Sequence, residues 1–178
     1  MKKITDKIID SGNTAVLVVD MQYGSGLFFH KDHWNELIKN QVAILEFCKK
    51  NDIPAYLLEM RTYGETVASI WDAFIKVPRA AYLFRKEYGD AFYKTDVRKV
   101  LREWNISKVF ISGVNASVCV YQTAIGAKKS GLDVITADNV IADSPVDYMF
   151  TGEIPNPAPE FERKGILYLW DYQSYFRK

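Results

Sequence analysis

The chain has 178 residues, 48% of them hydrophobic and 25% charged, which predicts a single domain over residues 1–178 that buries its core without disulfides or metals. Its formal net charge of +1 gives no electrostatic reason to expect a nucleic acid or a membrane as a partner. Two cysteines are too few for a disulfide scaffold, and no apolar stretch suits a signal peptide or a bilayer span, so the sequence favours a cytoplasmic protein.

Apolar runs and helical patterns alternate along the chain. The first strand is expected at residues 15–19, and apolar residues at helical spacing predict an amphipathic helix over about 33–50, with Cys48 in the core. Further strands are expected at residues 54–59, 81–84, 109–111, 132–135 and 166–169, with helices near residues 66–75, 95–104 and 119–130. Gly131 suits the C-terminal cap of the last of these helices. This alternation predicts an α/β fold of three layers, with a mostly parallel six-stranded sheet between helices on both faces.

The segment 144–160 interrupts this alternation. It contains four prolines, Pro145, Pro155, Pro157 and Pro159, and therefore cannot form one continuous helix. A lid, a subunit contact and a plain surface connection all fit its composition.

Three residues capable of chemistry stand at the ends of predicted strands. Asp20 follows the first strand, Lys86 follows the third, and Cys119 begins a helix after the fourth. Because ligands of open parallel sheets bind outside the carboxyl ends of the strands, we expect these side chains in one crevice. There the carboxylate can accept the thiol proton, while the helix N-terminus and the lysine charge lower the pKa of the thiol or the acid. Each also has a structural interpretation: Asp20 as a turn cap, Lys86 as a solvated lysine and Cys119 as an inert core cysteine.

The order and spacing of these residues resemble those of the isochorismatase-like cysteine hydrolases, a superfamily that includes nicotinamidases and N-carbamoylsarcosine amidohydrolases. The matching segments are Val18-Val19-Asp20-Met21-Gln22, Lys86 with Asp90-Ala91-Phe92, Gly113-Val114 before Cys119-Val120, and Thr123-Ala124. The resemblance implies a Rossmann-like topology and hydrolysis of a small-molecule amide or related C–N bond through a thioester on Cys119. It also implies Asp20 as general base and acid and Lys86 as their electrostatic partner.

The same resemblance implies an unusual backbone beside the thiol. The peptide bond between Val114 and Asn115 is expected to be cis, with the N–H groups of Asn115 and Cys119 forming an oxyanion hole. Homodimers or homotetramers are implied as well, and aromatic residues near Tyr148, Phe150, Tyr172, Tyr175 and Phe176 suit such a contact unless the C-terminal strand buries them.

No metal or other cofactor is expected. Nicotinamidase-type relatives carry an Asp and two His ligands after the second strand, but residues 59–65 of this chain contain no histidine. His30, Asp32 and His33 lie close in sequence, yet a site there needs a further ligand. Because the metal of those relatives holds the pyridine nitrogen, nicotinamide is disfavoured as the substrate.

The substrate is expected to be a small molecule, apolar or planar if the aromatic residues near the crevice line its pocket. The pocket candidates are Gln22, Tyr23, Phe28, Trp71, Tyr88, Phe92 and Tyr121, although aromatic side chains of this kind also fill cores.

Three other functions are compatible with the sequence. A non-catalytic binding or interaction module is possible, because the same fold serves unrelated functions. An isochorismatase-type vinyl ether hydrolase is a second alternative, although that reaction does not require the cysteine retained here. A thiol redox sensor at Cys119 is the third, and it lacks a resolving cysteine nearby in the sequence.

Overall fold

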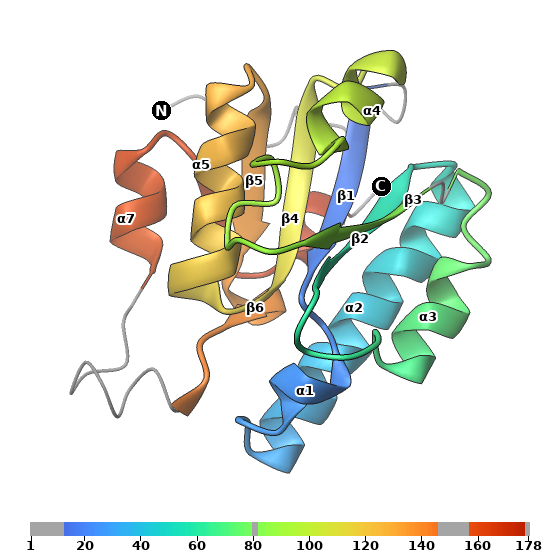
Figure 1. The fold of residues 1–178 in the computed structure, drawn as a ribbon, viewed down its shortest axis with the longest axis vertical. Coiled ribbons are helices and arrows are strands. Elements are labelled where there is room, and N and C mark those ends of the chain that lie inside the picture. Colours follow the sequence, from blue (N-terminus) through green and yellow to red (C-terminus); the bar gives the residue numbers. More distant parts are fainter. Residues whose placement is uncertain (1–12, 80–81, 146–156, 177–178) are drawn as a thin grey trace.

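The computed structural model describes residues 13–79, 82–145 and 157–176 (Figure 1). Seven strands form one parallel sheet: β1 (Thr14–Val19), β2 (Ala55–Met60), β3 (Tyr82–Lys86), β4 (Lys108–Val114), β5 (Asp133–Ala137), β6 (Ile141–Ala142) and β7 (Leu167–Leu169). The strand order is β3-β2-β1-β4-β5-β7, and β6 pairs with the end of β4. The expected parallel α/β sheet is therefore confirmed, with one strand more than the six predicted.

The central strands are apolar because both of their faces are covered. Every residue of β1 is buried, as are all residues of β4 after Lys108, as expected for parallel strands between two layers of helices. At the edge of the sheet, β3 has exposed and half-buried residues until its last residue, Lys86, which is buried.

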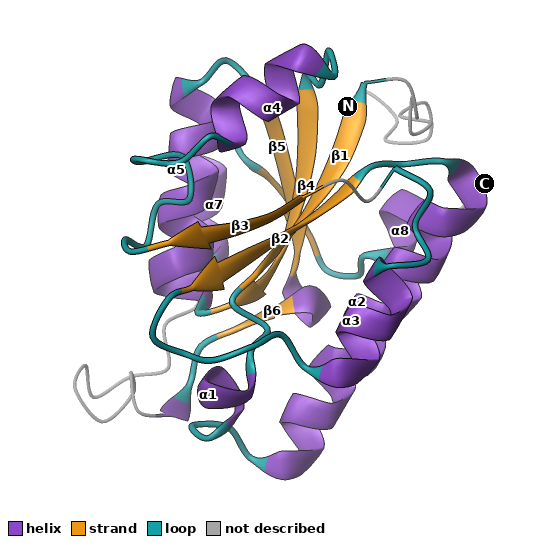
Figure 2. Ribbon diagram, turned by 45° about the vertical axis from the view of Figure 1, so that its right-hand side comes forward, coloured by secondary structure: helices purple, strands orange, loops and turns teal. Residues whose placement is uncertain are grey.

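Helices cover both faces of the sheet (Figure 2). One face carries α2 (Lys31–Asn51), α3 (Ala68–Phe74) and α8 (Gln173–Phe176), and the other carries α4 (Val97–Glu103), α5 (Tyr121–Lys129) and α7 (Ala158–Arg163). Short helical turns at α1 (Tyr23–Gly26), η2 (Ala116–Val120) and η3 (Asp138–Val140) follow β1, β4 and β5. The three predicted layers are confirmed, and the short turns follow the carboxyl ends of β1, β4 and β5.

The helix boundaries follow local signals in the sequence. The apolar stripe of α2 buries Cys48 completely, as predicted. The α5 helix ends before Gly131, whose φ of +84° is in the left-handed region and whose N–H donates to the carbonyl of Lys128. The first N–H of α4, that of Val97, donates to Thr95 Oγ1 at 3.4 Å.

The C-terminal aromatic residues belong to the core. Tyr172, Tyr175 and Phe176 are only 8%, 6% and 6% exposed. The ring of Phe110 in β4 stacks on Tyr175 and meets Phe176 edge-on, with Phe47 of α2 on the other side of Phe176. Of the two alternatives for these three residues, a subunit contact or burial at the C-terminal end of the chain, the structure supports burial, because Tyr175 and Phe176 pack on Phe110 of β4 and Phe176 also packs on Phe47 of α2. Tyr148 and Phe150 lie outside the described residues.

The proline-containing segment is described only at its two ends. Residues 144–145 follow β6, and α7 begins directly after its N-cap residue Pro157, with Pro159 in the first turn, where a missing N–H is tolerated. Its proposed alternatives as a lid, a contact or a connection fall on residues 146–156, which lie outside the described residues. Across the described ranges, no helix is long and apolar enough to cross a membrane.

Candidate active site

Asp20, Lys86 and Cys119 meet at the carboxyl edge of the sheet. Asp20 follows β1, Lys86 ends β3, and Cys119 lies in η2, a π-helical turn between β4 and α5. Their exposures are 1%, 1% and 7%. Lys86 Nζ donates to Asp20 Oδ2 at 2.8 Å, and Cys119 lies close enough for the Asp20 charge to raise the pKa of its thiol. The geometry therefore joins the acid, the cation and the thiol in one buried cluster.

Backbone contacts fix the carboxylate of Asp20. Its φ of +52° is in the left-handed region, which turns the chain away from β1, and its N–H donates to the carbonyl of Leu58 at 2.8 Å. The N–H of Met60 donates to Asp20 Oδ1 at 2.9 Å, while Lys86 holds the other oxygen. One oxygen of the acid thus has a donor from the adjacent strand β2, and the other has a donor from β3, the next strand beyond it.

The main chain beside the thiol is equally constrained. The peptide bond between Val114 and Asn115 is cis, at the position that the sequence comparison implied. Gly113, with φ +117°, brings its backbone so close to β1 that an added Cβ would lie 2.0 Å from the carbonyl oxygen of Val19. The carbonyl of Asn115 accepts the N–H groups of Val118 and Val120 at 3.2 and 3.0 Å, which closes the turn that carries Cys119.

A carboxylate from the next loop anchors the same turn. Asp143, just after β6, accepts two hydrogen bonds at its Oδ1, from the N–H and from the hydroxyl of Ser117, both at 2.8 Å. The short strand β6 places this acid by pairing Ile141 and Ala142 with Gly113 and Val114. The seventh strand therefore has a local role, since it supports the loop that holds the thiol.

Burial dominates the protonation of the cluster. It raises the pKa of Cys119 to about 12 from 9.0, and the negative charge of Asp20 adds to this effect while Lys86 opposes it. The pKa of Asp20 is also raised by burial, against the opposing charge of Lys86. The expected low pKa values are therefore wrong, because desolvation outweighs both the lysine and the position of the thiol at the start of a helix. The resting thiol is protonated at neutral pH.

The cavity at the thiol is small. It is lined by Asp20, Ser25, Phe28, Tyr63, Val114, Asn115 and Cys119. Its free volume of about 20 Å³ is enough for roughly one water-sized group. Of the seven pocket candidates chosen from the sequence, the structure places only Phe28 around this cavity.

The other six candidates have different surroundings. Gln22 is fully buried, and its side-chain amide hydrogen-bonds only to the backbone in the described residues. Oε1 accepts from the N–H of Met60, and Nε2 donates to the carbonyls of Met60 and Gly64. Tyr23 and Trp71 line a separate cavity of about 400 Å³ beside β3. Gln22 therefore supports the end of β2, where Met60 donates to Asp20, and the loop that follows it.

The remaining three candidates lie around α5 and the loop after β3. Tyr88 packs edge-on against Tyr93, and its carbonyl, at 3.4 Å, is the second acceptor of Lys86 Nζ. The N–H of Phe92 donates to Asp90, and the ring of Tyr121 meets Phe161 edge-on. The structure places none of their side chains around the small cavity.

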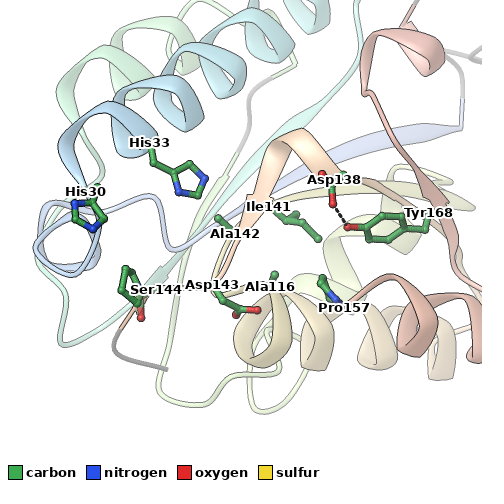
Figure 3. A pocket seen from close by; sticks show the side chains of 11 residues that line it. His30, His33, Ala116, Asp138, Ile141, Ala142, Asp143, Ser144, Pro157 and Tyr168 are labelled. Atoms are coloured by element: carbon green, nitrogen blue, oxygen red, sulfur yellow. Dashed lines mark hydrogen bonds between the residues drawn. The ribbon is translucent and has the colours of Figure 1, made fainter. Parts of the chain in front are cut away.

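A larger cavity of about 450 Å³ is lined by Ala116 of η2 and by Asp143 and Ser144 after β6 (Figure 3). His30 and His33 face it from one side and Tyr168 from the other, where the Tyr168 hydroxyl donates to Asp138 at 2.7 Å. Within residues 13–79, 82–145 and 157–176, no group of three or more His, Cys, Asp or Glu side chains is placed to hold a metal ion.

Sequence analysis missed three residues at this site: Ser25, Tyr63 and Asp143. Ser25 lies between two glycines immediately after the Asp20 motif, a pattern typical of a tight turn close to a strand end. Asp143 follows the apolar run Val140-Ile141-Ala142, which is the same signal that identified Asp20. Tyr63 lies in a loop after β2 and carries no comparable signal.

The fold and the cluster define an α/β protein with a buried thiol site at the carboxyl edge of a parallel sheet. The family model for the Isochorismatase domain matches residues 14–152. The chain therefore belongs to the isochorismatase-like family of hydrolases. A comparison with curated proteins gives no significant match.

Solved structures share the fold at low sequence identity. The nicotinamidase SaPncA from Staphylococcus aureus is 21% identical, with a TM-score of 0.73 over 89% of this chain and 99% of that chain. The N-carbamoylsarcosine amidase from Thermoplasma acidophilum is 20% identical, with a TM-score of 0.70 over 88% and 95%. The YcaC gene product from Escherichia coli, described as an octameric hydrolase of unknown specificity, is 22% identical, with a TM-score of 0.74 over 94% and 79%.

Proposed function

We propose that the chain is a cysteine-dependent hydrolase that cleaves the C–N bond of a small-molecule amide. The observation that carries this proposal is the buried contact of Lys86 with Asp20 at 2.8 Å, on a carboxylate whose charge also raises the pKa of the Cys119 thiol. An ion pair that is 1% exposed on both sides is expensive to desolvate, so its retention favours a role in chemistry over a role in stability.

In the proposed first half-reaction, the Cys119 proton moves to Asp20 as Sγ bonds to the carbonyl carbon. The carbonyl oxygen becomes an oxyanion, and the N–H groups of Asn115 and Cys119 are its donors in this proposal. Such donors are worth about 10²–10³-fold in rate. Asp20 then passes the proton to the nitrogen, the C–N bond breaks, and the amine or ammonia leaves a thioester on Cys119.

In the second half-reaction, water replaces the amine. Asp20 takes a proton from the water while the water oxygen bonds to the thioester carbon. The C–S bond then breaks, Asp20 returns a proton to the sulfur, and the carboxylic acid leaves. In both half-reactions Lys86 is the counter-ion of whichever group is negative.

The SaPncA and N-carbamoylsarcosine amidase structures are named for amide or related C–N substrates, which supports this choice of bond. The proposal includes a single domain over residues 1–178, a cytoplasmic location and a homodimer or homotetramer. The description of the YcaC gene product as octameric supports assembly in general, and light scattering of the purified protein measures its size.

The test is ammonia release from a panel of short primary amides, with trapping of the thioester by hydroxylamine and peptide mass spectrometry. Release by the parent and loss in Cys119→Ala are expected. Cys48→Ala is the matched control, because Cys48 is equally a buried cysteine but lies within α2, away from the cavity. Amide hydrolysis that survives Cys119→Ala, or a parent that releases no ammonia from any amide while folded, contradicts the proposal.

A further inference from the structure

The Ser25 hydroxyl is a buried polar group at the reacting thiol without a partner. Ser25 is 5% exposed, and among the described residues its Oγ has no hydrogen-bond partner. It lines the same small cavity as Asp20, Asn115 and Cys119. Buried hydroxyls are usually hydrogen-bonded, and this unpaired one lines the cavity at Cys119, so it is available to bind a ligand there.

The position of Ser25 is set by close backbone packing on both sides. A Cβ on Gly24 would lie 2.6 Å from the carbonyl oxygen of Tyr63, and a Cβ on Gly26 would lie 2.6 Å from the indole nitrogen of Trp34. The N–H of Gly24 donates to that Tyr63 carbonyl at 2.9 Å. The two glycines therefore let α1 fit between the loop after β2 and the start of α2, which holds the serine between them at the cavity.

Both oxygens of the neighbouring Asp20 carboxylate already accept hydrogen bonds. Lys86 and Met60 donate to the two oxygens of Asp20. The free volume of about 20 Å³ admits roughly one water-sized group beside the sulfur. The part of a substrate that enters this space must therefore be small, and Ser25 Oγ is free to hydrogen-bond a polar atom on it.

We propose that Ser25 Oγ hydrogen-bonds a polar atom on the acyl side of the substrate, so that the site selects amides with a short, polar acyl group. This inference rests on the proposed function, since the position of the carbonyl carbon follows from attack by Cys119. Ser25 is then a specificity-determining residue that binds the substrate and takes no part in proton transfer.

The test compares glycolamide with propionamide, which differ by a hydroxyl in place of a terminal methyl group. Each amide is titrated as a protectant of Cys119 against iodoacetamide, followed by mass spectrometry, so that affinity is measured whether or not the amide is hydrolysed. The parent is expected to bind glycolamide about tenfold more tightly, the ratio for one neutral hydrogen bond. Ser25→Ala is expected to bring this ratio close to one, and Ser25→Thr to keep part of it.

Ser112→Ala is the matched control. Ser112 in β4 is also a buried serine whose Oγ has no partner among the described residues, but it does not line the cavity. It is expected to keep the parent ratio. A parent ratio near one, a ratio unchanged by Ser25→Ala, or no protection by either amide overturns the inference. Protection with the expected ratio but without ammonia release instead contradicts the proposed hydrolysis and leaves the role of Ser25 in binding intact.

Discussion

Replacing Asp20 by Asn is expected to change two properties of Cys119 in opposite directions. The charge of Asp20 contributes to the raised pKa of the thiol, which is about 12 against 9.0. Asn is nearly the same size and removes that charge, so the pKa of Cys119 should fall and its thiolate should become more abundant. The same change removes the proton acceptor, so the proposed hydrolysis should nearly stop.

The size of the first effect follows from the pKa values. At pH 8 a thiol with a pKa of about 12 is roughly 10⁻⁴ thiolate, whereas one with a pKa of 9.0 is about one tenth thiolate. Burial is the largest cause of the shift and remains in the variant, so recovery of the whole factor of about 10³ is the upper bound. We expect Asp20→Asn to accelerate alkylation at least tenfold at pH 8 and to lower hydrolysis by about 10²–10⁴-fold.

The assay is the rate of iodoacetamide addition to Cys119 between pH 7 and pH 10, followed by peptide mass spectrometry. In the parent the rate should rise about tenfold per pH unit without a plateau, because this whole range lies below the pKa of the thiol. Glu59→Gln is the matched control, since Glu59 is a buried carboxylate that bonds Thr66 and does not contact Cys119. Slower or unchanged alkylation in folded Asp20→Asn refutes the reasoning, as does a parent plateau below pH 8.

Three other substitutions or treatments test the packing and protonation of the site. Gly113→Ala should lower the free energy of unfolding by more than about 2 kcal/mol in thermal unfolding, because its Cβ would lie 2.0 Å from the carbonyl oxygen of Val19. Gly64 is also at positive φ but has open space around it, so Gly64→Ala should lower the free energy of unfolding by only about 1 kcal/mol. Lys86→Met should destabilise by about 3–5 kcal/mol in urea unfolding, since it leaves the Asp20 carboxylate buried without its cation, and a loss below 1 kcal/mol contradicts the ion pair. Hydrogen peroxide at pH 7.5 should oxidise Cys119 more slowly than free cysteine, because the thiol is buried and protonated; faster oxidation in mass spectrometry favours the redox sensor.

The sheet could be predicted because its strands are continuous apolar runs. Residues 15–19 and 109–111 were found in this way, and both belong to strands buried on their two faces. Ile141–Ala142 was missed because two residues carry no periodicity, and only their pairing with Gly113 and Val114 makes them a strand.

The cluster of Asp20, Lys86 and Cys119 could be predicted for a similar reason, but its surroundings could not. Strand ends in a parallel sheet share one edge, so Asp20 and Lys86 are brought together by topology alone. Which loop side chains line the cavity depends on their direction: Gln22 turns to the backbone of Met60, whereas Ser25, three residues later, lines the cavity. The direction of the pKa shift of Cys119 could not be predicted either, because the sequence shows the start of a helix but not how deeply the thiol is buried.

Charge balance links this burial to the proposed mechanism. A cluster of Lys86 cation, Asp20 anion and neutral thiol has no net charge, whereas ionising the thiol as well would leave a buried net charge of −1. Burial disfavours that state, so the proton should leave Cys119 only as the new bond forms. Its transfer to Asp20 moves the single negative charge from the carboxylate to the developing oxyanion, and Lys86 balances it before and after. The burial that raises the pKa of the Cys119 thiol therefore favours one of two routes. It favours attack by a neutral thiol that loses its proton to a general base, and it disfavours attack by a thiolate formed beforehand.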